Sequence, residues 1–504
     1  MRFSDERFFP KSRIWVTVLI LLALAASACA AEIEPDISAS VTLPGEAQAE
    51  GDASVTLQGP ELLDEGVRIL PDQTAESVPP ETTVDEAAVS DESASDAGQP
   101  SENQAVADTS TDAPVGTPDV FVETPCVAPA DSTVTGEAPA SVVSALEAAA
   151  GHPDFAGLDV SVSVWIDGWG EVLSHDADLA LVPASNEKIL VAHAANELLD
   201  PSSTLETSIE QVGSDLVFRA GGDPTFSTWR AHLLIDQVIE AGITSADRLV
   251  IDVSEFPQPA AAPGWQGWQL RNFVGPLSGF MLDDNRWNTT EEFLEAPATL
   301  NGEWLSDTLQ NRGVSIGSVE LGNPDPGQVV ATVQSEPISE LVSSMMLFSD
   351  NQIADMLVLQ LGLVNGQGTL ADGIAQIEAE LAELCVPLSG VMDDGSGLSR
   401  ANHRSAREFQ EILRAMRDSD TADVFETQLP VGGISGTLGG RFGGDPWRVR
   451  AKTGTIFGGR ALSGYATTDS GREAVFSILI NGERDRTSAS LGAMDALVRQ
   501  ILRS

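Results

Sequence analysis

Apolar residues alternate with other residues between positions 160 and 166, and this period of two predicts a half-buried β-strand. Gly168 and Gly170 then predict a turn, after which Val172 and Leu173 begin a returning strand. Similar patterns predict three more strands near the C-terminus, at 449–455, 461–466 and 474–480. We expect these segments to pair with one another.

Helical spacing marks the segments around these strands. Apolar residues recur every three to four positions at 142–150, 189–199 and 488–502. The order helix, hairpin, helix, and later three strands with a closing helix, predicts an α+β fold in which helices flank an antiparallel sheet. The middle of the chain, 201–338, mixes short strand-like runs with turns, and we interpret it as an inserted domain.

The first thirty residues have the order of a secretory signal: a basic start, an apolar run at 14–26, and then small residues. The run is too short to favour a stable membrane span. Two interpretations of the cleavage site remain open. Residues 28–30 fit an A-x-A cleavage site, whereas residues 26–29 resemble a lipoprotein box that would place a lipid anchor on Cys29. Both predict an extracytoplasmic protein of the cell envelope, secreted or lipid-anchored.

Residues 31–137 are rich in Ala, Ser, Thr, Pro and acidic residues and contain one basic residue, Arg68. Such a segment buries too little apolar surface to offset the entropy of ordering it. We interpret it as a disordered acidic tether. The formal net charge of −49 over 504 residues argues against nucleic acid and anionic lipid surfaces as partners.

The chain has three cysteines. Cys29 lies in the signal, which leaves Cys126 and Cys385. An oxidising compartment permits a disulfide between these two, and two unrelated buried thiols are the alternative.

Lysine is scarce, because the sequence contains only Lys11, Lys188 and Lys452, and Lys11 lies in the signal. A lysine kept where arginine is used elsewhere indicates a role that arginine cannot fill, since a partly desolvated amine can lose its proton. Composition bias alone is the alternative explanation. Lys188 follows Ser185 by three positions, so on a helix its amine would lie beside the hydroxyl and could take its proton.

Two further motifs carry candidate chemistry. Residues 349–351 read Ser-Asp-Asn, where the serine can relay a proton and the asparagine can hold a substrate amide. Residues 452–455 read Lys-Thr-Gly-Thr, where the hydroxyls can bind a carboxylate and the glycine lets a substrate backbone lie against the strand edge. Each motif alone is weak or modest, but the three in this order form a specific combination.

With these motifs the chain resembles the class C low-molecular-mass penicillin-binding proteins, the D-alanyl-D-alanine carboxypeptidase/endopeptidases. The similarity covers about residues 140–500 and leaves out the signal and the tether. Four more segments resemble the family's sequence: Val-Pro-Ala-Ser at 182–185, Gly-Gly-Asp-Pro-Thr at 221–225, Asp-Gly-Ser-Gly-Leu-Ser-Arg at 394–400, and the run at 429–442.

The resemblance implies a serine-type D-alanyl-D-alanine carboxypeptidase, and possible endopeptidase, with a β-lactamase/transpeptidase-like fold. Ser185 would form the acyl-enzyme and Lys188 would be its base. Ser349 and Lys452 would pass the proton to the leaving D-alanine. Peptidoglycan stem peptides would be the substrates and β-lactam antibiotics the inhibitors, and no cofactor or metal is implied.

The same resemblance assigns the substrate contacts. Asn351 would bind the stem-peptide amide, and Thr453 and Thr455 would hold the terminal carboxylate beside Gly454. The backbone N–H groups of Ser185 and Thr455 would form the oxyanion hole. The predicted organisation is a signal at 1–30, a tether at 31–137, a catalytic domain at 138–200 and 339–504, and an insert at 201–338.

Several alternatives stay open. The family usually has two extra domains between the first two motifs, whereas here Ser349 follows Ser185 by 164 positions, so we expect one insert domain, or one with a reduced second. A β-lactamase would need a carboxylate to activate water, and no convincing E-x-x-x-N segment follows Ser349. A binding module without turnover is the third hypothesis. The tryptophans of the insert are packing residues or a glycan platform: Trp265, Trp268, Trp287 and Trp304.

Overall fold

The computed structural model describes residues 134–257, 261–285 and 296–504. These residues belong to one compact unit that spans Val115–Ser504. The predicted signal, nearly all of the tether, Cys29, Cys126 and Trp287 lie outside the described residues, so what was predicted for them stays a prediction.

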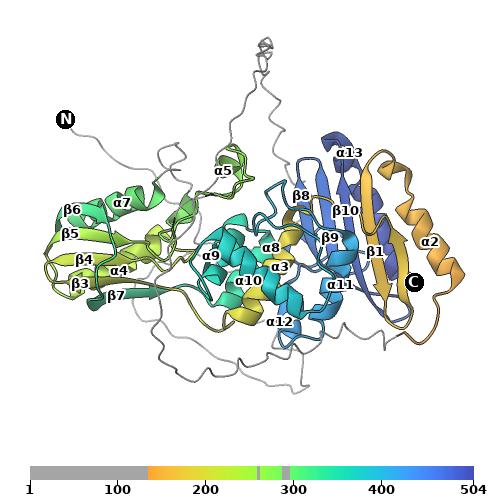
Figure 1. The fold of residues 1–504 in the computed structure, drawn as a ribbon, viewed down its shortest axis with the longest axis horizontal. Helices are drawn as coiled ribbons and strands as arrows, with labels where there is room; N and C mark the ends of the chain where they lie inside the picture. The colour runs from red at the N-terminus through yellow and green to blue at the C-terminus, as the bar shows by residue number, and fades with distance from the viewer. Residues whose placement is uncertain (1–133, 258–260, 286–295) are drawn as a thin grey trace, which may run out of the picture. The chain divides into compact units, whose positions relative to one another are not determined.

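The main sheet contains five antiparallel strands in the order β2-β1-β10-β9-β8. Its N-terminal hairpin pairs with the last strands of the chain, as Figure 1 shows at the right of the view. The predicted antiparallel sheet is confirmed. The strands are β1 (Asp159–Ile166), β2 (Gly170–His175), β8 (Val449–Ile456), β9 (Gly459–Thr467) and β10 (Glu473–Asn481).

Helices cover both faces of this sheet because its strands are apolar on both sides. Val162, Val164 and Phe476 pack with α2 (Ala140–Ala150) and α14 (Leu491–Leu502). Alternate residues of the same strands point the other way, so Trp165 and Val475 join the core of the second helical layer. That layer contains α3 (Lys188–Leu198), α8 (Ile338–Phe348), α9 (Asn351–Gly362), α10 (Leu370–Glu383), α11 (Ala406–Met416) and α12 (Ala422–Gln428).

The closing helix differs in one detail from the prediction, which was a single helix at 488–502. The structure has two helices, α13 (Arg484–Ala489) and α14, with Ser490 between them. The Ser490 hydroxyl donates to the carbonyl of Thr487, and this side-chain bond accompanies the break.

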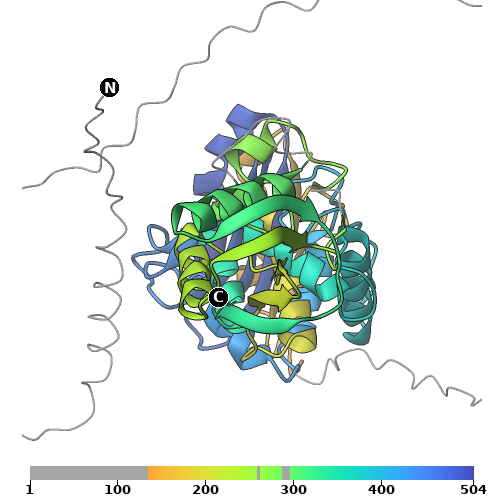
Figure 2. The same cartoon turned by 90° about the vertical axis from the view of Figure 1, so that its left-hand side faces the viewer.

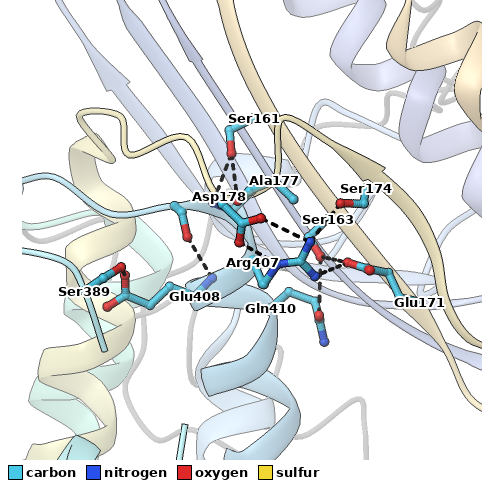
Figure 3. A network of polar contacts seen from close by, with 12 residues as sticks. Ser161, Ser163, Glu171, Ser174, Ala177, Asp178, Ser389, Arg407, Glu408 and Gln410 are labelled. Atoms are coloured by element: carbon cyan, nitrogen blue, oxygen red, sulfur yellow. Dashed lines mark hydrogen bonds and ion pairs between the residues drawn. The ribbon is translucent and has the colours of Figure 1, made fainter. Parts of the chain in front are cut away.

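Polar contacts fix α11 on the sheet (Figure 3). Ser163 of β1 donates to Gln410 of α11 at 3.3 Å, and the Ser161 hydroxyl accepts the N–H of Ala406 at 3.1 Å. Arg407 pairs at the rim with Glu171 of β2. Ser161 and Ser163 of β1 therefore face α11 and bind it through hydrogen bonds, at positions where larger apolar side chains could otherwise have packed.

The part of the chain between the first two motifs builds a second, mixed sheet in the order β6-β5-β4-β3-β7, which faces the viewer in Figure 2. Its β4-β5 and β5-β6 pairs are parallel, and α4 (Thr228–Glu240) and α7 (Pro297–Asn311) provide the crossovers and pack on one face. The strands are β3 (Glu206–Val212), β4 (Asp215–Arg219), β5 (Ser245–Asp252), β6 (Ser315–Leu321) and β7 (Gln328–Gln334).

A short segment after β5 packs against α9 instead of the second sheet. Phe256, Trp265 and Leu270 form a small core with Met356 and Leu359 of α9. This segment carries the one-turn helix α5 (Gln269–Asn272). It also contacts the Ser-Asp-Asn motif, because the Asn351 amide donates to the carbonyl of Phe273.

Cys385, just after α10, is disulfide-bonded. The chain has only two other cysteines, Cys29 and Cys126, and both lie outside the described residues. We therefore keep the Cys126–Cys385 pair as a proposal.

Candidate active site

The nucleophile candidate lies on a tight turn that leads into a buried helix. Residues Ala184–Glu187 form a 3-10 turn after Pro183, and α3 begins at Lys188. Ala184 adopts a φ of +49°, an uncommon conformation for a residue with a Cβ. Asn186 ties this turn to the sheet, because its amide donates to the Ser463 hydroxyl of β9 at 2.6 Å.

Lys188 is fully buried and its amine contacts the first two motifs together. Its Nζ donates to the Ser185 hydroxyl at 3.2 Å and to the Asn351 side-chain oxygen at 2.8 Å. It also donates to the backbone carbonyl of Ser396. The predicted adjacency of hydroxyl and amine is therefore present in the structure, on a 3-10 turn instead of a regular helix.

The second motif occupies the junction of two helices. Ser349 ends α8 in a left-handed conformation with a φ of +60°, and the Asp350 side chain caps α9 by accepting from the N–H of Ile353 at 2.9 Å. The Ser349 hydroxyl accepts from Lys452 Nζ at 2.9 Å. Ser185 with Lys188 and Ser349 with Lys452 therefore form two serine–lysine pairs that face the same space.

The third motif lies on β8, the edge strand of the main sheet. Gly454 packs behind the nucleophile turn, since a Cβ there would lie 2.9 Å from the Pro183 carbonyl oxygen. The structure thus gives this glycine a packing reason, and its predicted substrate contact stays a prediction. The Thr453 hydroxyl donates to that of Thr437 at 2.8 Å, a partner that the sequence did not indicate.

The outer edge of β8 presents backbone N–H groups. Ala451 donates its N–H to Pro430, and Val449 accepts from Gly432, both on the side away from β9. Because backbone groups alternate along a strand, the N–H groups of Thr453 and Thr455 point to the same outer side. An extended peptide could therefore pair with this edge.

Burial prepares both amines to exchange protons. It lowers the pKa of Lys188 to about 8, although nearby carboxylates such as Asp355 and Asp394 oppose the shift. Burial and the charge of Lys188 hold the pKa of Lys452 well below its usual range. Both amines can therefore be neutral much closer to physiological pH than an exposed lysine could.

The three motifs border one cavity of about 1060 Å³. Ser185, Ser349 and Asn351 line its floor, and Thr455 lines the strand side. The segment after β5 supplies the opposite wall through Trp268 and other residues, so Trp268 is half-exposed over the site instead of packed in a core. Gln266, Gln269 and Phe273 of the same segment also line the cavity, as do Arg400, Phe457 and Arg484 from other parts of the chain.

Sequence reasoning missed the acidic residues that hold the loop behind the nucleophile. Asp394 accepts from the N–H groups of Gly397 and Ser399 and from the indole of Trp265 at 2.6 Å. Asp394 begins the 394–400 segment that resembles the family's sequence, and these bonds show which loop it shapes. Asp355 was not singled out, although it lies four positions after Asn351 and therefore on the same face of α9.

No group of three or more His, Cys, Asp or Glu side chains among the described residues could hold a metal ion. Within residues 134–257, 261–285 and 296–504, every helix is too short or too polar to cross a bilayer.

Comparison with known proteins decides the family. The model of the D-Ala-D-Ala carboxypeptidase 3 (S13) family matches residues 142–294 and 293–501. The chain belongs to the S13 family. The predicted resemblance is thereby confirmed, and with it the prediction of a serine hydrolase of the D-alanyl-D-alanine carboxypeptidase type.

Two relatives are similar in sequence, and one solved structure shares the fold. A carboxypeptidase of Mycobacterium tuberculosis is 30% identical over 409 residues, which are 74% of this chain and 86% of that protein. The D-alanyl-D-alanine carboxypeptidase of Actinomadura sp. (strain R39) is 28% identical over 425 residues, 66% of this chain and 78% of that protein. Penicillin-binding protein 4 of Haemophilus influenzae superposes with a TM-score of 0.62 at 19% identity, over 72% of this chain and 99% of that one. This likeness confirms the predicted fold class.

Proposed function

We propose that this S13 protein cleaves the terminal D-alanine from peptidoglycan stem peptides through an acyl-enzyme on Ser185. The observation that carries the proposal is the pairing of Lys188 with Ser185 and of Lys452 with Ser349 at one cavity. Each amine lies within hydrogen-bond reach of a hydroxyl, which is the geometric requirement for proton transfer.

The first half of the reaction forms the ester. Neutral Lys188 takes the proton of Ser185, and the hydroxyl oxygen attacks the carbonyl carbon of the penultimate D-alanine. The N–H groups of Ser185 and Thr455 would hold the negative oxygen, and such a donor typically contributes about 3 kcal/mol. As the tetrahedral intermediate collapses, the C–N bond breaks, and Ser349 with Lys452 would deliver a proton to the departing amine.

The second half needs water. A water molecule adds to the ester carbonyl, and its proton passes to the lysine–serine pairs while Ser185 is released with its hydrogen. The products are the shortened peptide and free D-alanine, so no group is left on the enzyme.

Two contacts would position the peptide. The hydroxyls of Thr453 and Thr455 would bind the terminal carboxylate, with Gly454 between them on β8, and Thr455 borders the cavity. Asn351 donates its amide N–H to the Phe273 carbonyl at 3.0 Å, so a substrate carbonyl that binds this amide would share or replace that bond. The cavity volume, about 1060 Å³, exceeds what two alanines need, which supports an endopeptidase activity on cross-linked peptides as well.

Inhibitors, organisation and location follow the same proposal. Penicillin-binding protein 4 of Haemophilus influenzae was solved in complex with a β-lactam, and we propose β-lactams as acylating inhibitors here. We propose a catalytic domain at 138–200 and 339–504 with an insert at 201–338.

We place the protein outside the cytoplasm, either secreted or lipid-anchored through Cys29, because a stem-peptide hydrolase needs access to the cell wall.

One experiment tests the function. Purified protein is mixed with a fluorescent penicillin and, separately, with a tripeptide that ends in D-alanyl-D-alanine. Stable labelling together with D-alanine release supports the carboxypeptidase. Rapid turnover of penicillin would instead indicate a β-lactamase, and labelling without release a binding module. Labelling that persists in Ser185→Ala would reject Ser185 as the nucleophile.

A further inference from the structure

Asp355 is a fully buried carboxylate that the reaction described above does not use. It lies on α9 one turn after Asn351, whose side-chain oxygen accepts from Lys188 Nζ. Residues four apart share a helix face, so Asn351 and Asp355 both face the amine. Burying a carboxylate costs several kcal/mol unless its oxygens find partners, so a core position for aspartate calls for an explanation.

One oxygen of Asp355 fixes a loop. Oδ1 accepts from the N–H groups of Gly395 and Ser396 at 2.8 and 3.0 Å. The carbonyl of the same Ser396 accepts from Lys188 Nζ. Asp355 is thus linked to the amine through the backbone of one residue, Ser396, and it holds the residue whose carbonyl orients the amine.

The loop that Asp355 holds also touches the nucleophile turn. Gly397 follows Ser396 with a φ of +79°, and a Cβ on it would lie 1.9 Å from the Ala184 carbonyl oxygen and 2.9 Å from the Ser185 nitrogen. The loop backbone therefore packs directly behind Ser185. A displacement of Ser396 would therefore shift both the Ser185 hydroxyl and the Lys188 amine.

The second oxygen of Asp355, Oδ2, is buried and accepts no hydrogen bond from the described residues. Hydrogen bonds therefore disperse the charge of Asp355 only through Oδ1, and the carboxylate acts on nearby cations through a poorly screened medium. Ionisable groups that act on Lys188 come from several elements: Glu187 on the nucleophile turn, Asp355 on α9, Asp350 before α9, and Asp394 in the loop, while Lys452 on β8 responds to Lys188 in turn. Among the charged neighbours, Asp355 has the largest effect on Lys188.

We propose that Asp355 is a positioning residue for Lys188: its carboxylate holds the Ser396 carbonyl against the amine and supplies the negative charge that sets how readily the amine gives up its proton. The inference rests on the proposed role of Lys188 as the base.

The titration of the pair agrees with this geometry. Burial and the neighbouring Asp394 raise the pKa of Asp355 to about 8, and burial lowers the pKa of Lys188 to about 8. The two pKa values are therefore shifted towards each other, and the charge of each group affects the titration of the other. A negative Asp355 favours the protonated amine, so removing that charge lowers the pKa of Lys188.

The test compares three variants of the full chain, using the rate constant of acylation by a fluorescent penicillin between pH 5 and pH 10. Acylation needs neutral Lys188, so the rate rises with pH through the pKa of that amine. In Asp355→Asn we expect this rise to move to lower pH by about one unit. Asp355→Glu keeps the charge, and its rise stays near that of the wild type while its rate falls at every pH. Asp223→Asn, another buried aspartate that accepts a backbone N–H, is the matched control and keeps the wild-type profile.

The outcomes separate the inference from the proposed function. An Asp355→Asn protein that labels on Ser185 but loses rate equally at all pH values would overturn the charge role and leave the carboxypeptidase intact. If Asp355→Asn does not fold, Asp355→Glu decides, because a shift of a full pH unit in that variant would contradict the proposal. Absence of labelling in the wild type would instead reject the proposed function itself.

Discussion

Lys188 meets three oxygen atoms from three parts of the chain, and this convergence explains why lysine was kept there. Its ammonium form is penalised by burial, so the amine can act as a base near its pKa of about 8. Arginine at the same place would stay protonated at any working pH. The scarcity of lysine in the sequence pointed to Lys188 and Lys452, and the structure has each amine beside a serine hydroxyl.

Substitution of the base tests this directly. We expect Lys188→Arg to lower the acylation rate by about 10²–10⁴-fold, because a fixed cation cannot take the Ser185 proton. In the wild type, the rate should rise with pH to a midpoint near 8. The measurement is the rate of penicillin acylation against pH, with thermal melting as the check on folding. A variant that keeps its rate within tenfold would contradict a neutral-amine base.

Other residues of the site could not be found from the sequence. Asp355 resembles any polar residue of a helix until Asn351 is known to face Lys188. Thr437 contacts Thr453 from a loop that the strand pattern of 449–455 does not include. Pairings of this kind depend on tertiary contacts between distant segments, which a single sequence does not display.

At the scale of elements, the edge strand β8 provides two different groups at one residue. In the proposed function, Thr455 would offer a backbone N–H to the oxyanion and a hydroxyl to the terminal carboxylate. We expect Thr455→Pro, which removes the N–H, to lower acylation by about 10²–10³-fold. Thr455→Val keeps the N–H and should mainly raise KM for the D-alanyl-D-alanine peptide. The comparison uses steady-state kinetics, and equal losses of kcat in both variants would refute the assignment of the N–H.

The loop behind the nucleophile gives a second prediction at this scale. Gly397→Ala should abolish most activity, because its Cβ would displace the Ala184 carbonyl as well as strain the backbone. Gly242→Ala is the matched control, since Gly242 has the same φ of +79° but nothing within 4 Å of the added carbon. Both variants carry the conformational penalty, about 1 kcal/mol, and only the first should lose acylation. Equal activity in the two variants would show that the loop does not support Ser185.

The strands of the main sheet were predictable because each has a clear period of two or an apolar run with turns at its ends. The order of the second sheet was not predictable in the same way. Its parallel pairs depend on crossovers through α4 and α7, and parallel partners are chosen by packing against those helices. Figure 2 shows this sheet with its helices.

At the scale of the whole molecule, one buried histidine links folding to pH. Burial lowers the pKa of His193 on α3 to about 4, and neither ring nitrogen has a hydrogen-bond partner among the described residues. The unfolded chain binds this proton more tightly, so the stability that neutral His193 allows is present above pH 6.5 and is lost as the pH falls towards 4. The loss is about 3 kcal/mol, from a shift of roughly 2.5 pKa units.

Replacement of this histidine should flatten the acid limb of the stability curve. We expect His193→Leu to lose about 3 kcal/mol less than the wild type between pH 7 and pH 4, measured by urea unfolding. His403→Leu, at an exposed position, serves as the control and should keep the wild-type dependence. Parallel curves for wild type and His193→Leu would show that the acid sensitivity lies elsewhere.

The central claim is that Ser185 becomes an ester when Lys188 takes its proton, and peptide mapping by mass spectrometry tests it most directly. The full chain is treated with penicillin, digested and analysed for the acylated residue, alongside Ser185→Ala and Lys188→Arg. We predict one adduct, on Ser185, which is absent in Ser185→Ala and strongly reduced in Lys188→Arg. An adduct on another residue, or none on the folded wild-type protein, would contradict the account.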